Sequence, residues 1–322
     1  ELSRPFTSFT LHGKKDMYGR AELGTLLEGT LLMKVALSAV SIDGARMAME
    51  AELPGWDFDA TRKAARTAWD KELQRIRITT DNEQTKRIFY TAMYHAMMAP
   101  ALFSDVDGHY RGADGNIYQS DTPHYTNFSL WDTYRAQHPL ITLLHPTRSG
   151  DMMQSLVDKY RQGGWLPIFP CWNSYTAAMI GDHATAAIGD AYVKGVRNFD
   201  IHTAYEAMRK NAFTTPATYA EYADGMGRRA LRSYLTYGYI PVEDSVKEAY
   251  HRQEQTSRTL EYAYDDFVLA QVAQHLGHTA DHDTLMLRSE NYRYVIDPTT
   301  GYANGRHADG RFLSESNPYT FA

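Results

Sequence analysis

Two hydrophobic patterns divide the chain, and the change between them falls near residue 55. Before it, apolar residues alternate with polar or small ones, as Val35, Leu37 and Ala39 do, and a period of two is typical of a β-strand. A Pro-Gly pair at 54–55 ends this pattern. The sequence therefore predicts a β-rich segment over residues 1–52, followed by a domain boundary.

A helical period replaces the alternation after the boundary. Asp59 can cap a helix that begins near Ala60, and Trp69, Leu73 and Ile76 recur at the spacing of one helix face. No convincing pair of strands follows residue 60. We expect further helices over residues 82–98, 131–144, 151–161, 176–196, 202–212, 217–234, 256–276 and 280–292.

This succession of helices indicates stacked antiparallel hairpins. Such hairpins can close into a toroid whose loops gather at one end, and an open helical solenoid has the same local pattern. No internal repeat of about 34 or 40 residues is present, which disfavours a regular repeat array.

Composition narrows the range of functions. The 322 residues carry a net charge of −6, and the 33 Lys and Arg residues are spread evenly, so no basic patch for nucleic acid or anionic lipid is expected. No apolar run approaches the ~20 residues of a membrane span. The chain starts without Met, so we expect a processed or excised segment rather than a complete gene product.

Aromatic residues are numerous, with 23 Tyr, 12 Phe and 5 Trp, and many lie in loops beside Gly, Asn, Asp and Pro. Aromatic rings next to hydrogen-bonding groups can bind a sugar, which offers C–H faces and a rim of hydroxyls. Tyr is also common at partly buried surfaces without any such role.

The stretch "FSLWDTYRAQHP" places Trp131, Asp132 and Arg135 at the start of an expected helix. Negative charge is favoured in a first helical turn, so Asp132 could simply be a cap. An indole beside a carboxylate could instead form the floor of a sugar pocket. Arg135 could orient Asp132, or it could be a solvated side chain.

A second cluster lies in "LPIFPCWNSYTAAMIGDHATAAIGDAYVKG". Trp172, Asn173 and Tyr175 precede the expected helix, which then places Tyr175 and Asp182 on one face and His183 on the next. A buried Asp-His pair must be hydrogen-bonded, because desolvation is otherwise costly. The pair is either a satisfied part of the core or a wall of a site.

Two sets of neighbouring Asp residues give weaker indications of function. Asp105, Asp107 and Asp114 lack the ligand spacing of a helix–loop–helix calcium site, so a Gly-Asp turn is the favoured interpretation. Asp265 and Asp266 point about 100° apart on a helix, so we do not expect them to flank one bond. One of them is expected to support a loop by packing.

Several long strings resemble glycoside hydrolase family 92, the calcium-dependent exo-acting α-mannosidases. They are "LLMKVALSAVSIDGARMAMEAELPGWDFD", "LFSDVDGHYRGADG", "FSLWDTYRAQHPLITLLHP", "MIGDHATAAIGDAYVKG" and "TSRTLEYAYDDFVLAQVA". The resemblance implies a mostly α chain: an incomplete (α/α)6 toroid preceded by the end of an N-terminal β-sandwich. Residues 1–55 would be the sandwich remnant and linker, and residues 56–322 a truncated catalytic domain.

The same resemblance implies hydrolysis of terminal α-mannose with inversion, in which one carboxylic acid protonates the leaving oxygen and another carboxylate activates water. Trp131 and Asp132 would contact the terminal mannose. The expected general-acid position carries Tyr175, and the general base and most calcium ligands would lie beyond Ala322. The location would be periplasmic or extracellular.

The sequence therefore predicts an inverting, calcium-assisted glycosidase that acts on a mannose-containing glycan. Residues 1–322 alone are expected to be inactive. The alternatives are a glycan-binding protein without catalysis, which Tyr175 at the acid position would allow, and a toroid glycosidase with another sugar specificity.

Overall fold

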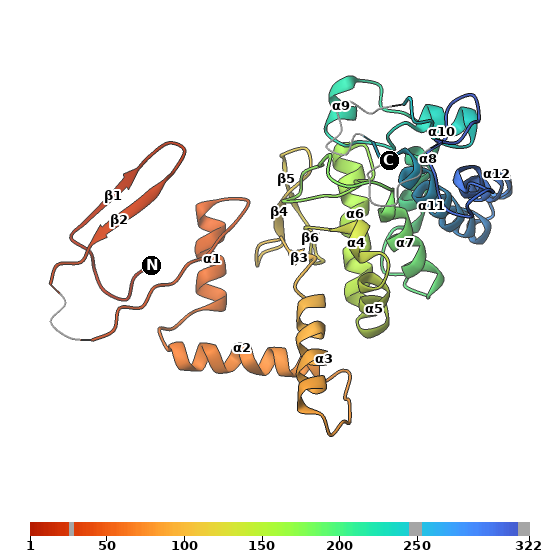
Figure 1. Cartoon of the computed structure of the whole chain (residues 1–322). Helices are drawn as coiled ribbons and strands as arrows, with labels where there is room; N and C mark the ends of the chain where they lie inside the picture. Colours follow the sequence, from red (N-terminus) through yellow and green to blue (C-terminus); the bar gives the residue numbers. More distant parts are fainter. Residues whose placement is uncertain (26–28, 245–252, 315–322) are drawn as a thin grey trace.

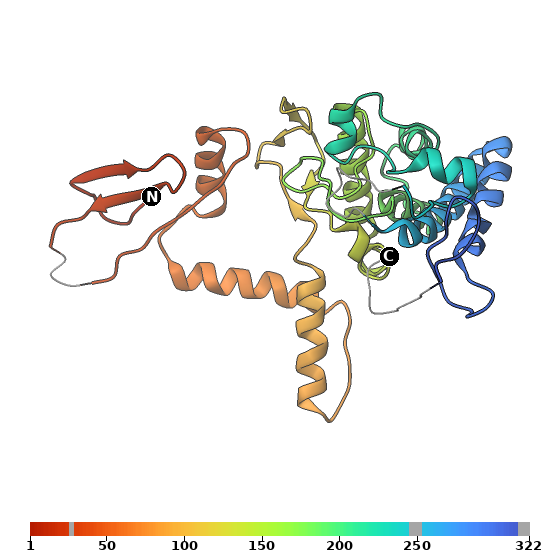
Figure 2. The same cartoon turned by 45° about the horizontal axis from the view of Figure 1, so that its top comes forward.

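A computed structural model of the chain describes residues 1–25, 29–244 and 253–314. The N-terminal part holds the strands β1 (Ser8–His12) and β2 (Tyr18–Glu22) and the helix α1 (Ile42–Glu52). Helices α2 (Phe58–Leu73) and α3 (Glu83–Ala96) connect it to the main body, as both views show (Figures 1 and 2).

The main body consists of short strands followed by packed helices. The strands are β3 (Ala101–Leu102), β4 (His109–Arg111), β5 (Ile117–Gln119) and β6 (Tyr125–Thr126). The helices are α4 (Leu130–Thr133), α5 (Gln137–Leu144), α6 (Pro146–Gly163), α7 (His183–Val193), α8 (Ile201–Phe213), α9 (Tyr219–Ala223), α10 (Leu231–Tyr237), α11 (Gln255–Leu276) and α12 (Thr279–Ser289), with the 3-10 turn η1 (Glu290–Val295).

The hydrophobic core lies where α6, α7, α8, α11 and α12 pack together. Each of these helices contributes a fully buried aliphatic or thioether side chain: Leu156, Ile188, Met208, Leu269 and Leu285. Burial of each such side chain contributes about 1.5–3 kcal/mol. The core therefore fixes the helices whose ends carry the candidate site.

The strand predicted from the alternation of Val35, Leu37 and Ala39 does not form. Val35 and Leu37 lie outside any strand, and Leu37 is 86% exposed. Residues 42–52 form α1, whose first turn is capped by the Ser41 hydroxyl accepting from the Gly44 N–H at 2.9 Å. Pairing stops at an isolated antiparallel bridge between Met33 and Leu2, whereas the Ser41 cap gives the following segment a helix start. The described sheet in the predicted β-rich region is the β1–β2 pair.

The main helices were predicted, but several of their ends differ. Asp57, not Asp59, caps α2, since its carboxylate accepts from the Ala60 N–H at 2.8 Å. The expected helix over 131–144 is broken into α4 and α5, and that over 217–234 into α9 and α10. Short antiparallel pairs, β3–β6 and β4–β5, also correct the expectation of no strand pairs after residue 60.

The largest error concerns residues 176–182. They form a loop in which Met179 and Gly181 have left-handed φ values of 61° and 82°, so α7 begins only at His183. The expected shared face of Tyr175 and Asp182 therefore does not exist. The division into residues 1–55 and 56–322 stays a prediction.

A buried charge cluster joins α7, α11 and α12. The guanidinium of Arg228, in the loop before α10, lies 2.9 Å from Asp182 Oδ2 and 2.6 Å from Asp266 Oδ1, and all three side chains are fully buried. Arg288 Nε pairs with the other Asp266 oxygen at 2.8 Å. Asp182 also accepts from the Asn211 amide at 3.0 Å. Each buried carboxylate thus has a cation.

Replacing Arg228 by Met should lower the free energy of unfolding by about 3–5 kcal/mol, because two buried carboxylates then lose a cation that no water can replace. Urea unfolding measures the change. The exposed Arg293, paired with Glu290 at 2.5 Å, is the matched control, and Arg293→Met should cost less than about 0.5 kcal/mol. Equal effects of the two substitutions would contradict the role given to Arg228.

Candidate active site

The short helix α4 presents two predicted site residues to the surface. Leu130 and Thr133 are buried and anchor the turn, so Trp131 and Asp132 face outward. Asp132 is exposed, and its carboxylate accepts from the Ser129 hydroxyl. Trp131 is half-buried, and its indole Nε1 is buried with no hydrogen-bond partner among the described residues. The structure therefore places a half-buried indole beside an accessible carboxylate.

Arg135 lies over the aromatic rings of α4. Its guanidinium carbon is 4.9 Å from the ring centre of Trp131 and 4.7 Å from that of Tyr134. The same group donates to Glu261 Oε1 at 3.1 Å and to the Tyr134 hydroxyl at 2.9 Å. Glu261, on α11, therefore fixes the cation that covers one face of the indole.

His183 lies behind this surface layer. Its ring stacks on Tyr134 with centres 3.9 Å apart. Nδ1 is 3.0 Å from Asp265 Oδ1, and Nε2 is 2.8 Å from Glu261 Oε2. Burial disfavours the charged imidazole, but the two carboxylates outweigh burial and raise the pKa of His183 to about 9. His183 and Arg135 likewise hold the pKa of Glu261 below its usual value, although burial acts in the opposite direction.

Asp182 does not reach this surface. It is fully buried and satisfied by Arg228 and Asn211, as the core interpretation of the Asp-His pair proposed. Asp265 and Asp266 have different partners, so they do not flank a common bond, as expected. Asp265 also accepts from the Asp182 N–H at 2.8 Å, which supports the loop before α7.

The second predicted cluster forms a separate turn. Asn173 is buried, and its side-chain oxygen lies 3.2 Å from His124 Nε2 while its amide donates to the Arg111 carbonyl. The Tyr175 hydroxyl lies against backbone, 3.1 Å from the Lys159 carbonyl and bonded to that of Trp165. Burial raises the pKa of Tyr175. Trp172, between them, is 76% exposed.

Sequence reasoning missed Glu261 and Tyr134. Both stand next to residues that it named: Tyr134 precedes Arg135, and Glu261 lies four residues before Asp265 on one face of α11. A carboxylate one helical turn before Asp265, on the same face, was the available signal, since it needs a partner when half-buried.

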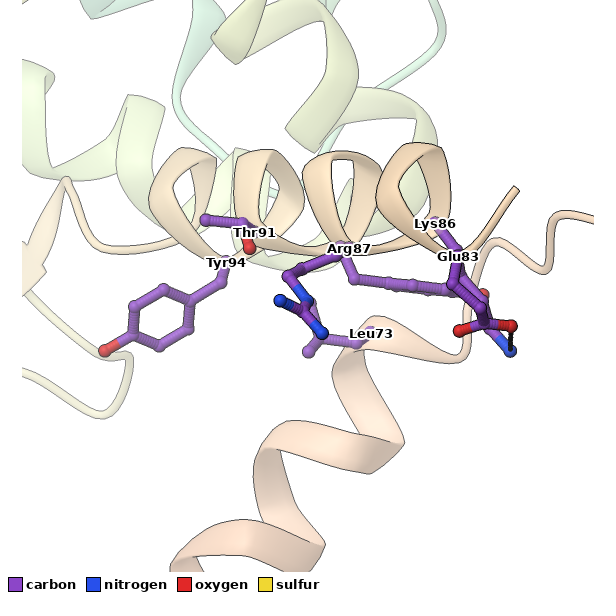
Figure 3. A pocket seen from close by; sticks show the side chains of 7 residues that line it. Leu73, Glu83, Lys86, Arg87, Thr91 and Tyr94 are labelled. Carbon is purple, nitrogen blue, oxygen red and sulfur yellow. Dashed lines mark ion pairs between the residues drawn. The ribbon is translucent and has the colours of Figure 1, made fainter. Parts of the chain in front are cut away.

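A groove at the corner of α2 and α3 is not the candidate site. It has a volume of about 350 Å³ and is lined by Leu73, Glu83, Lys86, Arg87, Tyr90, Thr91 and Tyr94. In Figure 3 its one carboxylate, Glu83, pairs with Lys86, and an ion-pair distance of 4.0 Å joins them. This lining offers no second acid group for glycosidase chemistry.

Calcium was expected from the resemblance. Within residues 1–25, 29–244 and 253–314, no three or more Asp, Glu, His or Cys side chains converge as metal ligands would. Asp105, Asp107 and Asp114 instead serve the turns around β4 and β5, where Asp107 caps the His109 N–H at 3.1 Å and Asp114 the Asn116 N–H at 3.0 Å. These three carboxylates therefore serve turns, and the calcium dependence expected from the resemblance stays a prediction.

Comparison with known proteins identifies the family. The model of the glycosyl hydrolase family 92 catalytic domain matches residues 44–321. The chain belongs to glycosyl hydrolase family 92. The structure of the family GH92 α-mannosidase BT3965 from Bacteroides thetaiotaomicron is 32% identical, with a TM-score of 0.83 over 99% of this chain and 44% of that chain. These matches confirm the predicted fold class, a mostly α chain of the (α/α) toroid type.

Two further matches agree with a glycosidase. The inverting mannosidase BT2199 from Bacteroides thetaiotaomicron is 26% identical, with a TM-score of 0.83 over 98% of this chain and 43% of that chain. An uncharacterized secreted glycosidase from Arthroderma benhamiae is 29% identical over 282 residues, which are 85% of this chain and 31% of that protein. The chain thus spans less than half of the relatives it matches. Within the described residues, no helix combines the length and apolar character needed to cross a bilayer.

The pKa of His183 predicts a pH dependence of stability. Since about 9 in the folded protein exceeds the ordinary 6.5, the stabilisation is fully present below about pH 6.5 and is lost as pH rises through 9. The stability advantage of the wild type over His183→Gln should therefore shrink by on the order of 3 kcal/mol between about pH 6 and pH 10. Urea unfolding of both proteins across this range measures it.

Comparing the wild type with His183→Gln cancels an opposing pH dependence that Lys159 contributes to the stability of both proteins. Burial lowers the pKa of Lys159 to about 7, so its contribution to stability rises with pH over the same range in both proteins. Gln274→Ala, at an exposed position on α11, removes no titratable group and is the control, so its difference from the wild type should not depend on pH. If the difference in free energy of unfolding between the wild type and His183→Gln did not change with pH, the ion pairs assigned to His183 would be refuted.

Proposed function

We propose that the intact protein is an exo-acting glycoside hydrolase that removes terminal α-linked mannose from glycans with inversion, outside the cytoplasm. Family membership supports the reaction class. Two neighbours are named α-mannosidase and inverting mannosidase, and BT3965 has also been solved with mannoimidazole, at 33% identity and a TM-score of 0.82 over 98% of this chain and 42% of that chain. The relative described as secreted supports the location.

The observation that carries the proposal is the accessible Asp132 carboxylate beside the Trp131 ring. A carboxylate can accept hydrogen bonds from two adjacent sugar hydroxyls, and such charge-assisted bonds are stronger than neutral ones. The exposed part of the indole can pack against the C–H face of the same sugar. Arg135, held by Glu261, covers one face of the ring and fixes its surroundings.

Hydrolysis with inversion needs an acid and a base about 6.5–9.5 Å apart, so that a water fits between them. We assign neither role to a described residue. The resemblance places the water-activating carboxylates outside residues 1–322, and we propose that these residues alone bind the sugar without cleaving it.

One observation favours a second candidate function. The Tyr175 hydroxyl is engaged by backbone carbonyls, so the expected acid position offers no carboxylic acid and no free hydroxyl. A glycan-binding protein that keeps Trp131 and Asp132 but lacks catalysis would have this arrangement. Mannose binding without release of mannose from any nitrophenyl glycoside would favour that function, whereas release from a different glycoside would indicate another sugar specificity.

Asp132→Ala in the intact protein should lower kcat/KM on an α-mannoside by at least about 100-fold, because two charge-assisted hydrogen bonds to the sugar are lost. The midpoint of thermal unfolding should stay the same, since the side chain is exposed. Asp283→Ala, at an exposed carboxylate on α12, should change neither quantity. Wild-type kinetics of the Asp132 variant would remove this residue from the site.

Calcium dependence is a further proposal that rests on the family resemblance alone. Dialysis of the intact protein against a chelator should abolish release of mannose, and added calcium should restore it. Magnesium should restore less, since it demands a smaller octahedral site. Full activity in excess chelator would contradict the proposal.

A further inference from the structure

One lysine side chain lies inside the main body. Lys159, on α6, is fully buried, and its nitrogen Nζ lies 2.7 Å from the Tyr125 carbonyl oxygen and 3.0 Å from His124 Nε2. The centre of the Phe128 ring lies 5.5 Å from Nζ on another side. These neighbours include no carboxylate, although a fully buried lysine is normally paired with one. A proton on Lys159 is therefore costly for the folded protein.

The imidazole of His124, also buried, faces two groups that compete for one ring nitrogen. Nε2 is 3.0 Å from Lys159 Nζ and 3.2 Å from the Asn173 side-chain oxygen. An amide oxygen only accepts, so it needs a hydrogen on Nε2, whereas a lysine ammonium only donates, so it needs an Nε2 without one. A charged Lys159 and a hydrogen-bonded Asn173 oxygen therefore exclude each other.

Uptake of one proton by Lys159 changes which contact forms. While the amine is neutral, the hydrogen of His124 stays on Nε2 and is donated to Asn173. Once the amine is protonated, it donates to the lone pair of Nε2, and the ring hydrogen moves to Nδ1. That nitrogen has no hydrogen-bond partner among the described residues, but it lies 3.9 Å from Asp158 Oδ2. The Asn173 oxygen then has no donor.

The surroundings place this change near neutral pH. Burial lowers the pKa of Lys159 to about 7, and Asp158, which is paired with Arg161 at 3.5 Å, raises it only in part. Burial also lowers the pKa of His124, so the ring stays neutral while Lys159 titrates. The other titratable groups around the pair are uncharged near pH 7: the pKa is raised to about 12 for Tyr110, raised for Tyr175 and lowered to about 4 for His138, in each case chiefly by burial.

Asn173 belongs to a turn that needs external support. Trp172 and Asn173 have left-handed φ values of 49° and 63°, which residues other than glycine rarely adopt. Such conformations persist only where the surroundings impose them. The Asn173 side chain supplies part of this support, because its oxygen faces His124 and its amide donates to the Arg111 carbonyl. Loss of the bond to His124 should therefore loosen the turn at residues 171–174.

The turn in its place braces the segment that leads to the proposed sugar site. Residues 126–128 continue directly into α4, which carries Trp131 and Asp132. Three hydrogen bonds join this segment to residues 170–173: from the Asn173 N–H to the Thr126 hydroxyl at 2.7 Å, from the Trp172 N–H to the Asn127 side-chain oxygen at 2.8 Å and from the Phe128 N–H to the Pro170 carbonyl at 3.0 Å.

We propose that Lys159 and His124 are positioning residues for the site at Trp131 and Asp132, and that uptake of a proton by Lys159 weakens sugar binding by releasing Asn173. The inference rests on the proposed function and adds a regulation to it. Since neither residue contacts the sugar, the effect falls on KM rather than on kcat. KM should rise as the pH falls through about 7.

The experiment measures KM of the intact protein for a nitrophenyl α-mannoside from about pH 5.5 to about pH 8.5, as a ratio of variant to wild type in which ionisations of the catalytic groups cancel. Lys159→Met cannot take up the proton, and Asn173→Ala has no bond to lose. For both variants the KM ratio should fall by about threefold to tenfold from the alkaline to the acid end, as expected for one hydrogen bond. The kcat ratio should stay constant.

Lys194→Met, at an exposed lysine that ends α7, is the matched control, and its KM ratio should not change with pH. A pH-independent ratio for either test variant would overturn the inference, because a purely structural role alters KM equally at every pH. If Lys159→Met does not fold, Asn173→Ala alone gives the answer. A wild type that hydrolyses no nitrophenyl α-mannoside at any pH would instead overturn the proposed function.

Discussion

Charge compensation along helix α11 is the constraint on which the site depends. Its carboxylates at 261, 265 and 266 each require a cation, because they are largely or completely buried. Asp266 takes Arg228 and Arg288, Asp265 takes His183, and Glu261 takes His183 and Arg135. The series runs from the interior to the surface, so the position of Arg135 over Trp131 is set by the packing of the core.

This arrangement explains the crowding of polar groups around the start of α4. Arg135 and Tyr134 both donate hydrogen bonds to the Glu261 carboxylate. Leu130 and Thr133 are buried and anchor the turn in the core. Trp131 and Asp132 face outward, and the Ser129 hydroxyl is the one hydrogen-bond partner of the Asp132 carboxylate among the described residues. The surrounding network thus fixes the positions of the Trp131 ring and the Asp132 carboxylate, while its ion pairs are formed by other residues.

The sequence predicted those parts of the fold that depend on local periodicity. The helices around Met93, Leu156, Met208 and Leu269 follow from apolar residues at helical spacing. The loop over 176–182 was not predicted, because it contains a left-handed Met179, a conformation that non-glycine residues rarely adopt and that periodicity does not indicate. The strand expected at Val35, Leu37 and Ala39 failed for a different reason, since alternation indicates a strand but pairing there stops at the single Met33–Leu2 bridge.

The same distinction applies to the site. Trp131 and Asp132 were found from residue type and position, because a polar and aromatic surplus at a helix start is visible in the sequence. Glu261 was missed because its role comes from a contact 126 residues away, with Arg135. Asn173 and Tyr175 were named for their chemistry, but the structure uses them to hold a turn, and the exposed Trp172 is what that turn presents.

The most direct test of the account is a crystal structure of the intact protein with an unhydrolysed α-mannoside bound. The account predicts that one mannose ring lies against the indole of Trp131, with two of its hydroxyls within hydrogen-bonding distance of the Asp132 carboxylate. A mannoside bound elsewhere, with the side chains of Trp131 and Asp132 contacting only solvent or protein, would contradict it.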